Sequence, residues 1–570
     1  MIENFHNETF TVGIGGAAGD GIREAGNNLS AILRELGYDA YFSFTYPSLI
    51  RGGHNYSRLT FSKKKVWCDH TILDALIALD EPTIKLHRHE LAQNAVVFAD
   101  SFDAEDVALL KDNAVVIPMA ASSREISAAP ITRNSTALGA LCYLLDLPLP
   151  LMLDVLHKVF REKSLEANIV LANKGYDLLQ ARQFRHAKKI EPSESKKILL
   201  DGNTAFAKGL QAAGLDFYFA YPMTPASSIL HYLAREQKPD GLKVIQPENE
   251  IAVISMALGA SYAGKRVAIG TATGGFALMG EAYSFASIAE FPLAIAVSMR
   301  QGPATGVPTY SSQTDLRFVL HAGHGEFPRI VIAPGDPKEA FHAGIDAMNL
   351  AWKYQMPVII LLDKIVSENS MTSTIDTAPV RQEWGPDATT GKNYVRYAFT
   401  ENGVSPLAFP GTPDTTVHVT SYEHDEAGIT ADEAEPVKKM LDKRNKKNET
   451  IVREMSQHAP ISIYGDPNAE TAIVFFGSVK SPLLEAVQFL DTPLSLVQIK
   501  WLAPFPTHEV AAALSGKKRI IGIEANHEAQ LAGLLREKTG IVTTDRIERY
   551  DSRPFEPETL ALQIKELLSK

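Results

Sequence analysis

Two acidic side chains and one guanidinium stand where the chain can hold and transform a small anionic molecule. Glu248 and Glu250 immediately precede a run with apolar residues at helical spacing. Carboxyl groups there can exchange protons with a bound molecule, or merely favour the helix N-terminus by about 0.3 to 1 kcal/mol each. Arg300 follows an apolar run that begins at Leu293. Its planar guanidinium can hold a carboxylate in a bidentate manner, and a surface ion pair is the alternative.

The elements that must position these groups are short strands alternating with helices. From Phe217 to Arg300 the pattern strand, polar turn, helix repeats, with buried strands such as Val267 to Ile269. This pattern predicts an open parallel sheet with crossover helices. In such sheets ligands gather at the carboxyl ends of the strands. Tyr221 to Pro225, Thr271 to Gly275 and the residues named above all fall at predicted strand ends.

The chain of 570 residues is long enough for three or four domains. We expect an α/β protein with three α/β domains. The predicted first domain covers residues 1–188, the middle one 189–385 and the last one 461–570, with a connecting arm at 386–460. The arm is rich in Gly, Pro, Thr and charged residues, and a segment of this length that lacks regular structure is expected to wrap over another domain or subunit. The basic run Lys438 to Lys447 within it is interpreted as a solvated helix face.

Composition excludes several classes of protein. The net charge of -11 argues against nucleic-acid binding. No apolar run approaches the ~18 residues of a membrane helix, and the N-terminus is not signal-like, so a cytoplasmic protein is expected. Cys68 and Cys142 are too few for an iron-sulfur cluster and are predicted to be buried apolar residues. His321 and His324 lack further ligands for a metal, and packing or substrate hydrogen bonding is the expected role.

The first domain opens with a strand over Thr9 to Ile14 and a glycine-rich turn, Gly13 to Gly21, that leads into a helix. Such a turn offers backbone N–H groups to an anion, and it equally suits tight packing of strand against helix. It matches the dinucleotide fingerprint only loosely. A second loop, Tyr46 to His54, places Arg51 beside two glycines, which suits an anionic ligand.

Several longer motifs together resemble the alpha subunit of 2-oxoacid:ferredoxin oxidoreductases. They are YPMTPASS, PENEIAVISMALGASYAG, RQGPATGVPT, GHGEFPRIVIAP, the EHDEAG loop and RYDSRPFEPETL. They follow the family's order over nearly the whole chain, and they are most similar to the 2-oxoglutarate type with a gamma domain fused ahead of the alpha domains. The resemblance implies a Rossmann-like gamma domain, a thiamine-diphosphate pyrimidine-binding domain and a transketolase C-terminal-like domain.

The resemblance also implies the reaction and the partners. The reaction is oxidative decarboxylation of a 2-oxoacid, of which 2-oxoglutarate is expected, with coenzyme A to the acyl-CoA, CO₂ and reduced ferredoxin. A beta subunit would hold Mg²⁺, the diphosphate of thiamine diphosphate and a [4Fe-4S] cluster, in a dimer of alpha-beta heterodimers. The sequence Gly19 to Gly21 lacks the downstream Asn of a thiamine-diphosphate motif, so no metal is assigned here. The chain alone is expected to be inactive.

The resemblance assigns a role to each matching residue. Glu250 would be the catalytic carboxyl against the aminopyrimidine ring, with Glu248 as the alternative. Arg300, Thr224, Thr309 and Met223 would bind the substrate, and Arg300 would hold its carboxylate. The remaining assignments are Tyr221, Glu250, Thr273, Gly275 and Phe276 for the cofactor, and Ser48, Arg51 and Gly52 for coenzyme A. The turn Thr273-Gly-Gly-Phe276 and the segment Glu524 to Gln530 depart from the family pattern in their loops.

Four other functions remain open at this stage. The first is the same reaction with pyruvate or another 2-oxoacid as the substrate. A non-oxidative thiamine enzyme would lack iron and would not reduce ferredoxin. A scaffold subunit would tolerate loss of Glu250 or Arg300, and a nicotinamide dehydrogenase built on the N-terminal glycine-rich turn would transfer hydride without a partner.

Overall fold

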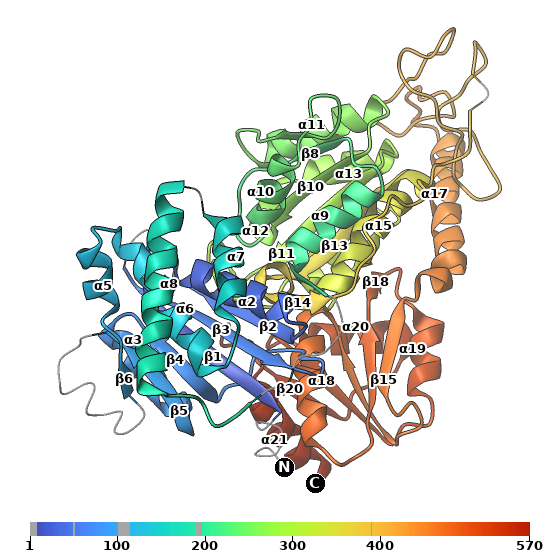
Figure 1. Ribbon diagram of the computed structural model, residues 1–570. Coiled ribbons are helices and arrows are strands. Elements are labelled where there is room, and N and C mark those ends of the chain that lie inside the picture. Colours follow the sequence, from blue (N-terminus) through green and yellow to red (C-terminus); the bar gives the residue numbers. More distant parts are fainter. Residues whose placement is uncertain are drawn as a thin grey trace.

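The computed structural model describes residues 8–49, 52–100, 114–160, 162–189, 191, 197–388 and 390–570. Figure 1 shows three α/β units, coloured blue to teal, green to yellow and orange to red along the chain. Each contains a β-sheet packed against helices, as the alternating sequence pattern predicts. Within the described residues no helix is both long and apolar enough to cross a membrane.

A seven-stranded sheet with the order β18-β12-β13-β11-β10-β8-β9 forms the middle unit. Its strands are parallel except β18, which pairs with β12 in the antiparallel direction. The strands are β8 (Phe217–Phe219), β9 (Lys243–Ile245), β10 (Val267–Ala272), β11 (Leu293–Met299), β12 (Ile330–Ile332), β13 (Pro357–Asp363) and β18 (Trp501–Ala503). The helices are α9 (Gly202–Ala212), α10 (Ser227–Arg235), α11 (Glu250–Tyr262), α12 (Thr273–Leu278), α13 (Gly280–Ile288), α14 (Leu316–His321), α15 (Pro337–Tyr354) and α16 (Lys364–Glu368).

Alternate residues of the central strands face two different apolar cores. On β10, Ala268 belongs to the core under α9, α10 and α15, whereas Val267 and Ile269 belong to the core under α11 and α13. This alternation follows from the two-residue side-chain period of a strand. The second core continues into the last unit through residues such as Val474 and Val497. The middle sheet and the last unit are therefore held together by a shared apolar interior.

An eight-stranded mixed sheet with the order β6-β5-β4-β1-β3-β2-β14-β7 forms the first unit. Its last two strands, β14 (Ser370–Ser373) and β7 (Ile198–Asp201), come from the span predicted as the middle domain. The other strands are β1 (Thr9–Ala17), β2 (Asp39–Thr45), β3 (His54–Ser62), β4 (Leu73–Ala78), β5 (Leu91–Ala99) and β6 (Ala114–Val116). The helices are α2 (Ile22–Glu35), α3 (Glu81–His87), α5 (Met119–Glu125), α6 (Arg133–Leu144), α7 (Leu149–Val159) and α8 (Glu162–Arg182).

The last unit contains a five-stranded sheet with the order β15-β17-β16-β19-β20. Its strands are β15 (Ile461–Gly465), β16 (Thr471–Phe475), β17 (Ser495–Ile499), β19 (Arg519–Glu524) and β20 (Asp545–Glu548). Its helices are α18 (Lys480–Ala486), α19 (Thr507–Leu514), α20 (Gln530–Thr539) and α21 (Pro557–Leu568). The short apolar runs at residues 472–476, 496–499 and 519–523 form β16, β17 and β19, which match these runs within one residue at each end.

The arm ends in helix α17 (Ala434–Glu454), whose basic face is partly buried. The interpretation of the run as a solvated face is wrong for Lys443, Arg444 and Lys447, which are each less than a tenth exposed. Both lysines donate to the buried carboxylate of Glu290 at the end of α13. This side of the helix is buried because the lysines pair with the Glu290 carboxylate, which lies far away in the sequence. Local sequence does not reveal such a partner.

A buried ion pair joins the first and last units. His70 donates through Nε2 to Glu485 Oε1 at 2.9 Å, and Glu485 also accepts from the Trp67 backbone N–H at 2.8 Å. Burial by itself lowers the pKa of His70, but the hydrogen bond and charge of Glu485 outweigh it and leave this pKa raised. A raised histidine pKa gives stability that is complete below about pH 6.5 and is lost as the pH rises through the folded-state value.

Replacing His70 with glutamine, which keeps a donor but not the charge, is expected to destabilise the fold by about 1 to 3 kcal/mol at pH 6. The difference from wild type should shrink between pH 6 and pH 9. Thermal unfolding of both proteins across this range measures it. The exposed His527, 3.8 Å from Glu548, provides the control His527→Gln, for which no such pH-dependent difference is expected. A pH-independent loss in His70→Gln would contradict the charged-pair assignment.

Candidate active site

The carboxyl edge of the middle sheet gathers most of the residues that the sequence singled out. Neighbouring strands β9, β8, β10 and β11 are parallel, so their carboxyl ends meet at one edge. Tyr221 to Pro225 follow β8, Glu248 and Glu250 follow β9, Thr273 follows β10 and Arg300 follows β11. This arrangement agrees with the strand-end argument made from the sequence.

Glu250 is the first residue of α11, and its environment differs sharply from that of Glu248. Asn249 caps the helix, with its side-chain oxygen accepting from the Ala252 N–H at 2.9 Å. Glu250 is 4% exposed, whereas Glu248 is exposed. Glu250 Oε1 is buried and has no hydrogen-bond partner among the described residues. Because buried polar atoms are normally paired, this oxygen is positioned for a polar group of a ligand.

Gly275 provides the close approach beside that carboxyl group. A Cβ atom at this position would lie 2.9 Å from Glu250 Oε1 and 2.1 Å from Thr271 Oγ1. Thr271 Oγ1 is also buried without a partner among the described residues. A side chain at position 275 would therefore collide with two polar atoms that have no partner among the described residues, and only glycine leaves the space beside them open.

Arg300 is held by the loop that contains the predicted substrate threonine. Its Nη1 donates to the Thr224 carbonyl oxygen at 2.9 Å. Burial lowers the pKa of Arg300, but an arginine stays charged at physiological pH. The structure gives no other hydrogen bond from this guanidinium to a described residue. Its remaining N–H donors can bind a carboxylate.

The other predicted residues fall into two groups. Met223 and Thr224 are half-buried beside the partly exposed Tyr221. Thr309 is buried in the loop after Arg300, and its Oγ1 has no partner among the described residues. Phe276, by contrast, is fully buried against the rings of Tyr283 and Phe318. The ring of Phe276 thus packs in the core and does not face the space beside Gly275.

The loop predicted for coenzyme A lies partly outside the described residues. Ser48 and Gly52 are exposed, and a Cβ at Gly52 would meet no atom within 4 Å. Arg51 lies outside the described residues. The loop follows β2, whose partner β14 begins directly after α16 at the carboxyl end of β13. Sheet pairing therefore brings this loop toward the edge that carries Arg300.

Sequence reasoning missed Lys364, which follows β13 at the same edge. It is buried, and its Nζ donates to the Phe44 carbonyl oxygen at 2.9 Å. The signal was a cation immediately after the apolar run Pro357 to Asp363, the same signal that identified Arg300. Because no motif surrounds it, that signal alone is weak.

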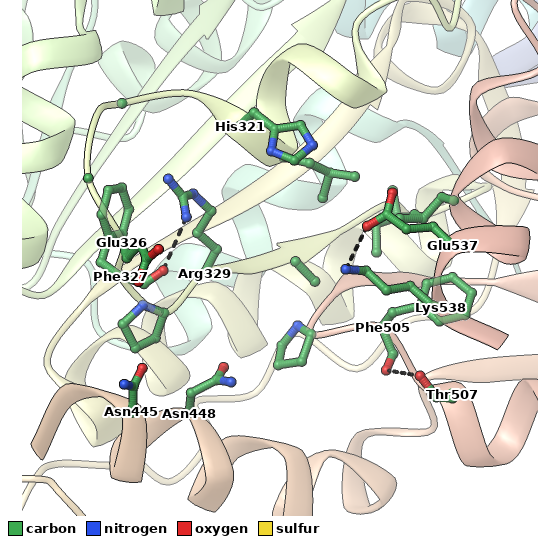
Figure 2. A pocket seen from close by; sticks show the side chains of 18 residues that line it. His321, Glu326, Phe327, Arg329, Asn445, Asn448, Phe505, Thr507, Glu537 and Lys538 are labelled. Carbon is green, nitrogen blue, oxygen red and sulfur yellow. Dashed lines mark hydrogen bonds and ion pairs between the residues drawn. The ribbon is translucent and has the colours of Figure 1, made fainter. Parts of the chain in front are cut away.

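A cavity of about 600 Å³ lies away from this edge, under α17 and beside α19 and α20. Figure 2 shows Asn445 and Asn448 of α17 projecting into it, with Arg329 and His321 on the other side. Arg329 precedes β12, so the cavity adjoins the amino end of the sheet. His321 lines this cavity, and His324 hydrogen-bonds through its backbone N–H to Ser284 Oγ at 2.8 Å. Neither histidine lies among the residues of the carboxyl edge.

Comparison with known proteins identifies the family of this chain. The family described as pyruvate flavodoxin/ferredoxin oxidoreductase, thiamine diphosphate-binding, matches residues 208–443. The family described as pyruvate ferredoxin/flavodoxin oxidoreductase matches residues 11–178. The 2-oxoacid:ferredoxin oxidoreductase subunit alpha of Saccharolobus solfataricus is 33% identical, over 98% of this chain and 97% of its own. That of a Sulfolobus species is also 33% identical, over 95% and 94%. This chain belongs to the 2-oxoacid:ferredoxin oxidoreductase alpha-subunit family.

A solved structure of a related enzyme has the same fold as this oxidoreductase subunit. It superimposes on the 2-oxoglutarate:ferredoxin oxidoreductase of Magnetococcus marinus, solved with 2-oxoglutarate, coenzyme A and succinyl-CoA bound. The TM-score is 0.88 at 29% identity, and the match covers 98% of this chain and 99% of the other. The 2-oxoglutarate oxidoreductase subunit KorA of Mycobacterium tuberculosis is 27% identical over 93% of this chain. The chain is therefore a subunit of an oxidoreductase that needs partner subunits.

The residues of the carboxyl edge fit thiamine diphosphate, whose binding domain spans 208–443. An aminopyrimidine ring carries nitrogen atoms that pair with a carboxyl group. Glu250 Oε1, which no described residue hydrogen-bonds, and the space left by Gly275 would supply such a pairing position.

Proposed function

We propose that this chain is the alpha subunit of a 2-oxoglutarate:ferredoxin oxidoreductase. With a beta subunit it converts a 2-oxoacid, coenzyme A and two oxidised ferredoxins into acyl-CoA, CO₂, two reduced ferredoxins and one proton. The observation that carries the proposal is the buried, unpaired Oε1 of Glu250 at the edge that also presents Arg300. The structural likeness to the Magnetococcus marinus enzyme supports 2-oxoglutarate, for which the product is succinyl-CoA.

Thiamine diphosphate supplies a carbon nucleophile that can add to the ketone and accept the electrons left by decarboxylation. The residues of this chain prepare that chemistry. Glu250, which is buried at the start of α11, holds a proton at Oε1 or accepts one there. Arg300 binds the 2-oxoacid carboxylate and so orients the adjoining ketone, with the Thr224 and Thr309 hydroxyls as further donors.

The beta subunit is assigned the remaining groups. We propose that it holds Mg²⁺, the diphosphate and a [4Fe-4S] cluster that passes single electrons to ferredoxin. A dimer of alpha-beta heterodimers is the proposed assembly. Coexpression of the two subunits, followed by coenzyme A-dependent reduction of a viologen dye with 2-oxoglutarate or pyruvate, tests the function. Reduction with pyruvate alone would assign a different 2-oxoacid, and absence of reduction with any 2-oxoacid would contradict the proposed reaction.

Replacing Arg300 with glutamine is expected to lower kcat/KM for the 2-oxoacid about 10- to 100-fold, mainly through KM. The reason is the loss of a charge-assisted hydrogen bond, worth about 1.5 to 3 kcal/mol. Steady-state viologen reduction at saturating coenzyme A measures the change. Arg235 at the end of α10 is exposed, and Arg235→Gln should leave both constants unchanged. Equal kinetics for the two variants would remove Arg300 from substrate binding.

A further inference from the structure

The loop after Arg300, residues 301–312, is closed on itself. The Gln301 N–H donates to the Tyr310 carbonyl oxygen at 3.4 Å, and the Val307 N–H donates to the Gln301 carbonyl oxygen at 2.9 Å. The Tyr310 N–H donates in turn to the Val307 carbonyl oxygen at 3.1 Å. Every hydrogen bond that this loop makes to described residues ends within residues 301–314. The hydrogen bonds that fix the loop relative to the rest of the protein must therefore come from the residues that follow it.

Gln313 is the first residue after the loop to bond another element, and all of its partners lie in the last unit. Its N–H donates to the Ala525 carbonyl oxygen at 2.8 Å, and its Oε1 accepts from the Ala525 N–H at 3.0 Å. Its Nε2 donates to the Phe476 carbonyl oxygen at 3.0 Å. Asn526 Nδ2 donates to the Gln313 carbonyl oxygen at 3.2 Å. This side chain is fully buried, and the main-chain and side-chain polar groups of Gln313 are all paired.

The last unit makes further contacts on both sides of Gln313. Gln530 Nε2 donates to the Thr314 carbonyl oxygen at 2.7 Å, and Gln530 Oε1 accepts from the Arg317 N–H at 3.0 Å. On the loop itself, the Arg553 guanidinium carbon lies 4.0 Å from the centroid of the Tyr310 ring, which is the geometry of a cation–π contact. The last unit thus holds both the loop and the residues that follow it.

Gln313 is held beside the strand end that presents Arg300. Gly477 follows β16 with a φ of 55°, and a Cβ there would lie 2.8 Å from Gln313 Nε2 and 3.3 Å from Asp363 Oδ2. A positive φ and this close approach both favour glycine. Asp363 is the last residue of β13 and pairs with Met299 of β11, the residue before Arg300. The anchor of the loop and the end of β11 are therefore separated by one strand.

We infer that Gln313 is a positioning residue, through which the last unit fixes the loop after Arg300. Arg300 itself is held by the ladders of β11 and by the Thr224 carbonyl oxygen. Loss of Gln313 consequently shifts the loop, with the buried Thr309 on it, relative to a guanidinium that stays in place. A shift of about 1 Å can lower a rate by about 10²-fold. The effect of the loop on the reaction rests on the proposed function.

The test uses Gln313→Met in the complex with the beta subunit. Methionine keeps the length of the side chain and removes its donor and its acceptor. Amide hydrogen exchange of residues 301–312, measured by mass spectrometry, is expected to become about tenfold faster, because the loop loses its anchor. In viologen reduction, kcat/KM for the 2-oxoacid should fall about 10- to 100-fold, with a raised KM. A smaller fraction of folded enzyme would lower kcat alone and leave this KM unchanged.

A second buried glutamine provides the matched control. Gln498 of β17 also joins the last unit to the middle one, since its Nε2 donates to Glu339 Oε2 on α15 at 2.7 Å. Its Oε1 accepts from the Tyr464 hydroxyl at 3.0 Å. Gln498→Met removes as many side-chain hydrogen bonds as Gln313→Met, none of them to the loop or to Gln313. It should lower the unfolding temperature similarly and leave the loop exchange and the 2-oxoacid KM within twofold of wild type.

Gln530→Met tests the same anchor from the side of the last unit. It removes the bonds to Thr314 and Arg317 and should reproduce both the faster loop exchange and the raised KM. All variants must copurify with the beta subunit.

Contrary results can be told apart. Unchanged loop exchange in Gln313→Met, or faster exchange with an unchanged KM, would overturn the inference. Equal changes in Gln498→Met would overturn it as well, because they would show a general loosening between the two units. A wild-type complex that converts no 2-oxoacid would contradict the proposed function. Loop exchange would then still decide whether Gln313 holds the loop.

Discussion

Glu250→Gln is expected to lower coenzyme A-dependent viologen reduction about 10²- to 10⁴-fold, the range typical for loss of a positioned acid or base. Glutamine has nearly the same shape as glutamate, so the packing beside Gly275 is retained. Its amide cannot exchange a proton at the position of Oε1, which is the buried atom left unpaired in the structure. The measurement compares kcat of the wild-type and variant complexes at saturating 2-oxoacid and coenzyme A.

Glu248 provides the matched control for this experiment, because it lies two residues away and is exposed. Glu248→Gln should retain at least half of the wild-type kcat. Both variants must copurify with the beta subunit, so that loss of assembly is not mistaken for loss of catalysis. If Glu248→Gln lost activity and Glu250→Gln kept it, the catalytic role would move to Glu248. If both kept it, the proton-transfer role would leave this chain.

The second large effect is expected for stability. Glu290→Gln should destabilise the middle unit and its arm by about 3 to 5 kcal/mol, the cost typical of breaking a buried ion pair from one side. The Glu290 carboxylate binds Lys443 and Lys447, and the Arg396 guanidinium donates to the Glu290 carbonyl oxygen at 2.8 Å. Removing the carboxylate leaves three buried cations without their counter-charge. Thermal unfolding and limited proteolysis within residues 386–460 measure the loss.

The pH dependence of this effect follows from the pKa of Glu290. Burial by itself raises the pKa, but Lys443, Lys447 and Arg396 together outweigh burial and hold it well below the usual range. A lowered carboxyl pKa gives stability that is complete above about pH 4.3 and is lost as the pH falls through the folded-state value. The difference between Glu290→Gln and wild type should therefore be constant from pH 5.5 to pH 7.5.

An exposed ion pair on the same helix serves as the control. Lys438 and Asp442 of α17 are more than half exposed, and Asp442→Asn should cost less than about 1 kcal/mol. Equal stability losses in Asp442→Asn and Glu290→Gln would show that the buried cluster contributes no more than a surface pair. Unchanged proteolysis of the arm in Glu290→Gln would show that the cluster does not anchor it.

Local sequence carried the information for the catalytic edge. The apolar runs that became β10 and β11 are short and bounded by polar turns, so their positions could be predicted from hydrophobic periodicity. Glu250 and Arg300 each follow a predicted parallel strand, and the carboxyl ends of parallel strands lie at one edge of a sheet. The sequence alone therefore assigned both residues to a common site, although they are far apart along the chain. The longer motifs around them identified the family, because their order and length are specific.

Tertiary structure alone decided which sheet each edge strand joins. β7 and β14 look like strands of the middle domain, but they pair with each other, and β14 pairs with β2, in the first sheet. β18 likewise leaves the last unit and pairs with β12. A strand's apolar pattern records that one or both faces are buried, and the backbone groups that form the ladder are the same in every residue. The sequence of a short strand therefore does not identify the strand with which it pairs.

The distinction between buried and exposed charge was also beyond the sequence. Lys438 and Lys443 belong to the same basic run, yet Lys438 is exposed and Lys443 is buried against Glu290, which is 153 residues earlier in the chain. Residue types and spacing determined that this chain has an α/β fold and a strand-end site with a carboxyl group and a guanidinium. The contacts between distant elements determined that Glu250 Oε1 has no hydrogen-bond partner among the described residues and that Lys443 meets Glu290. Burial and pairing depend on groups that only folding brings together.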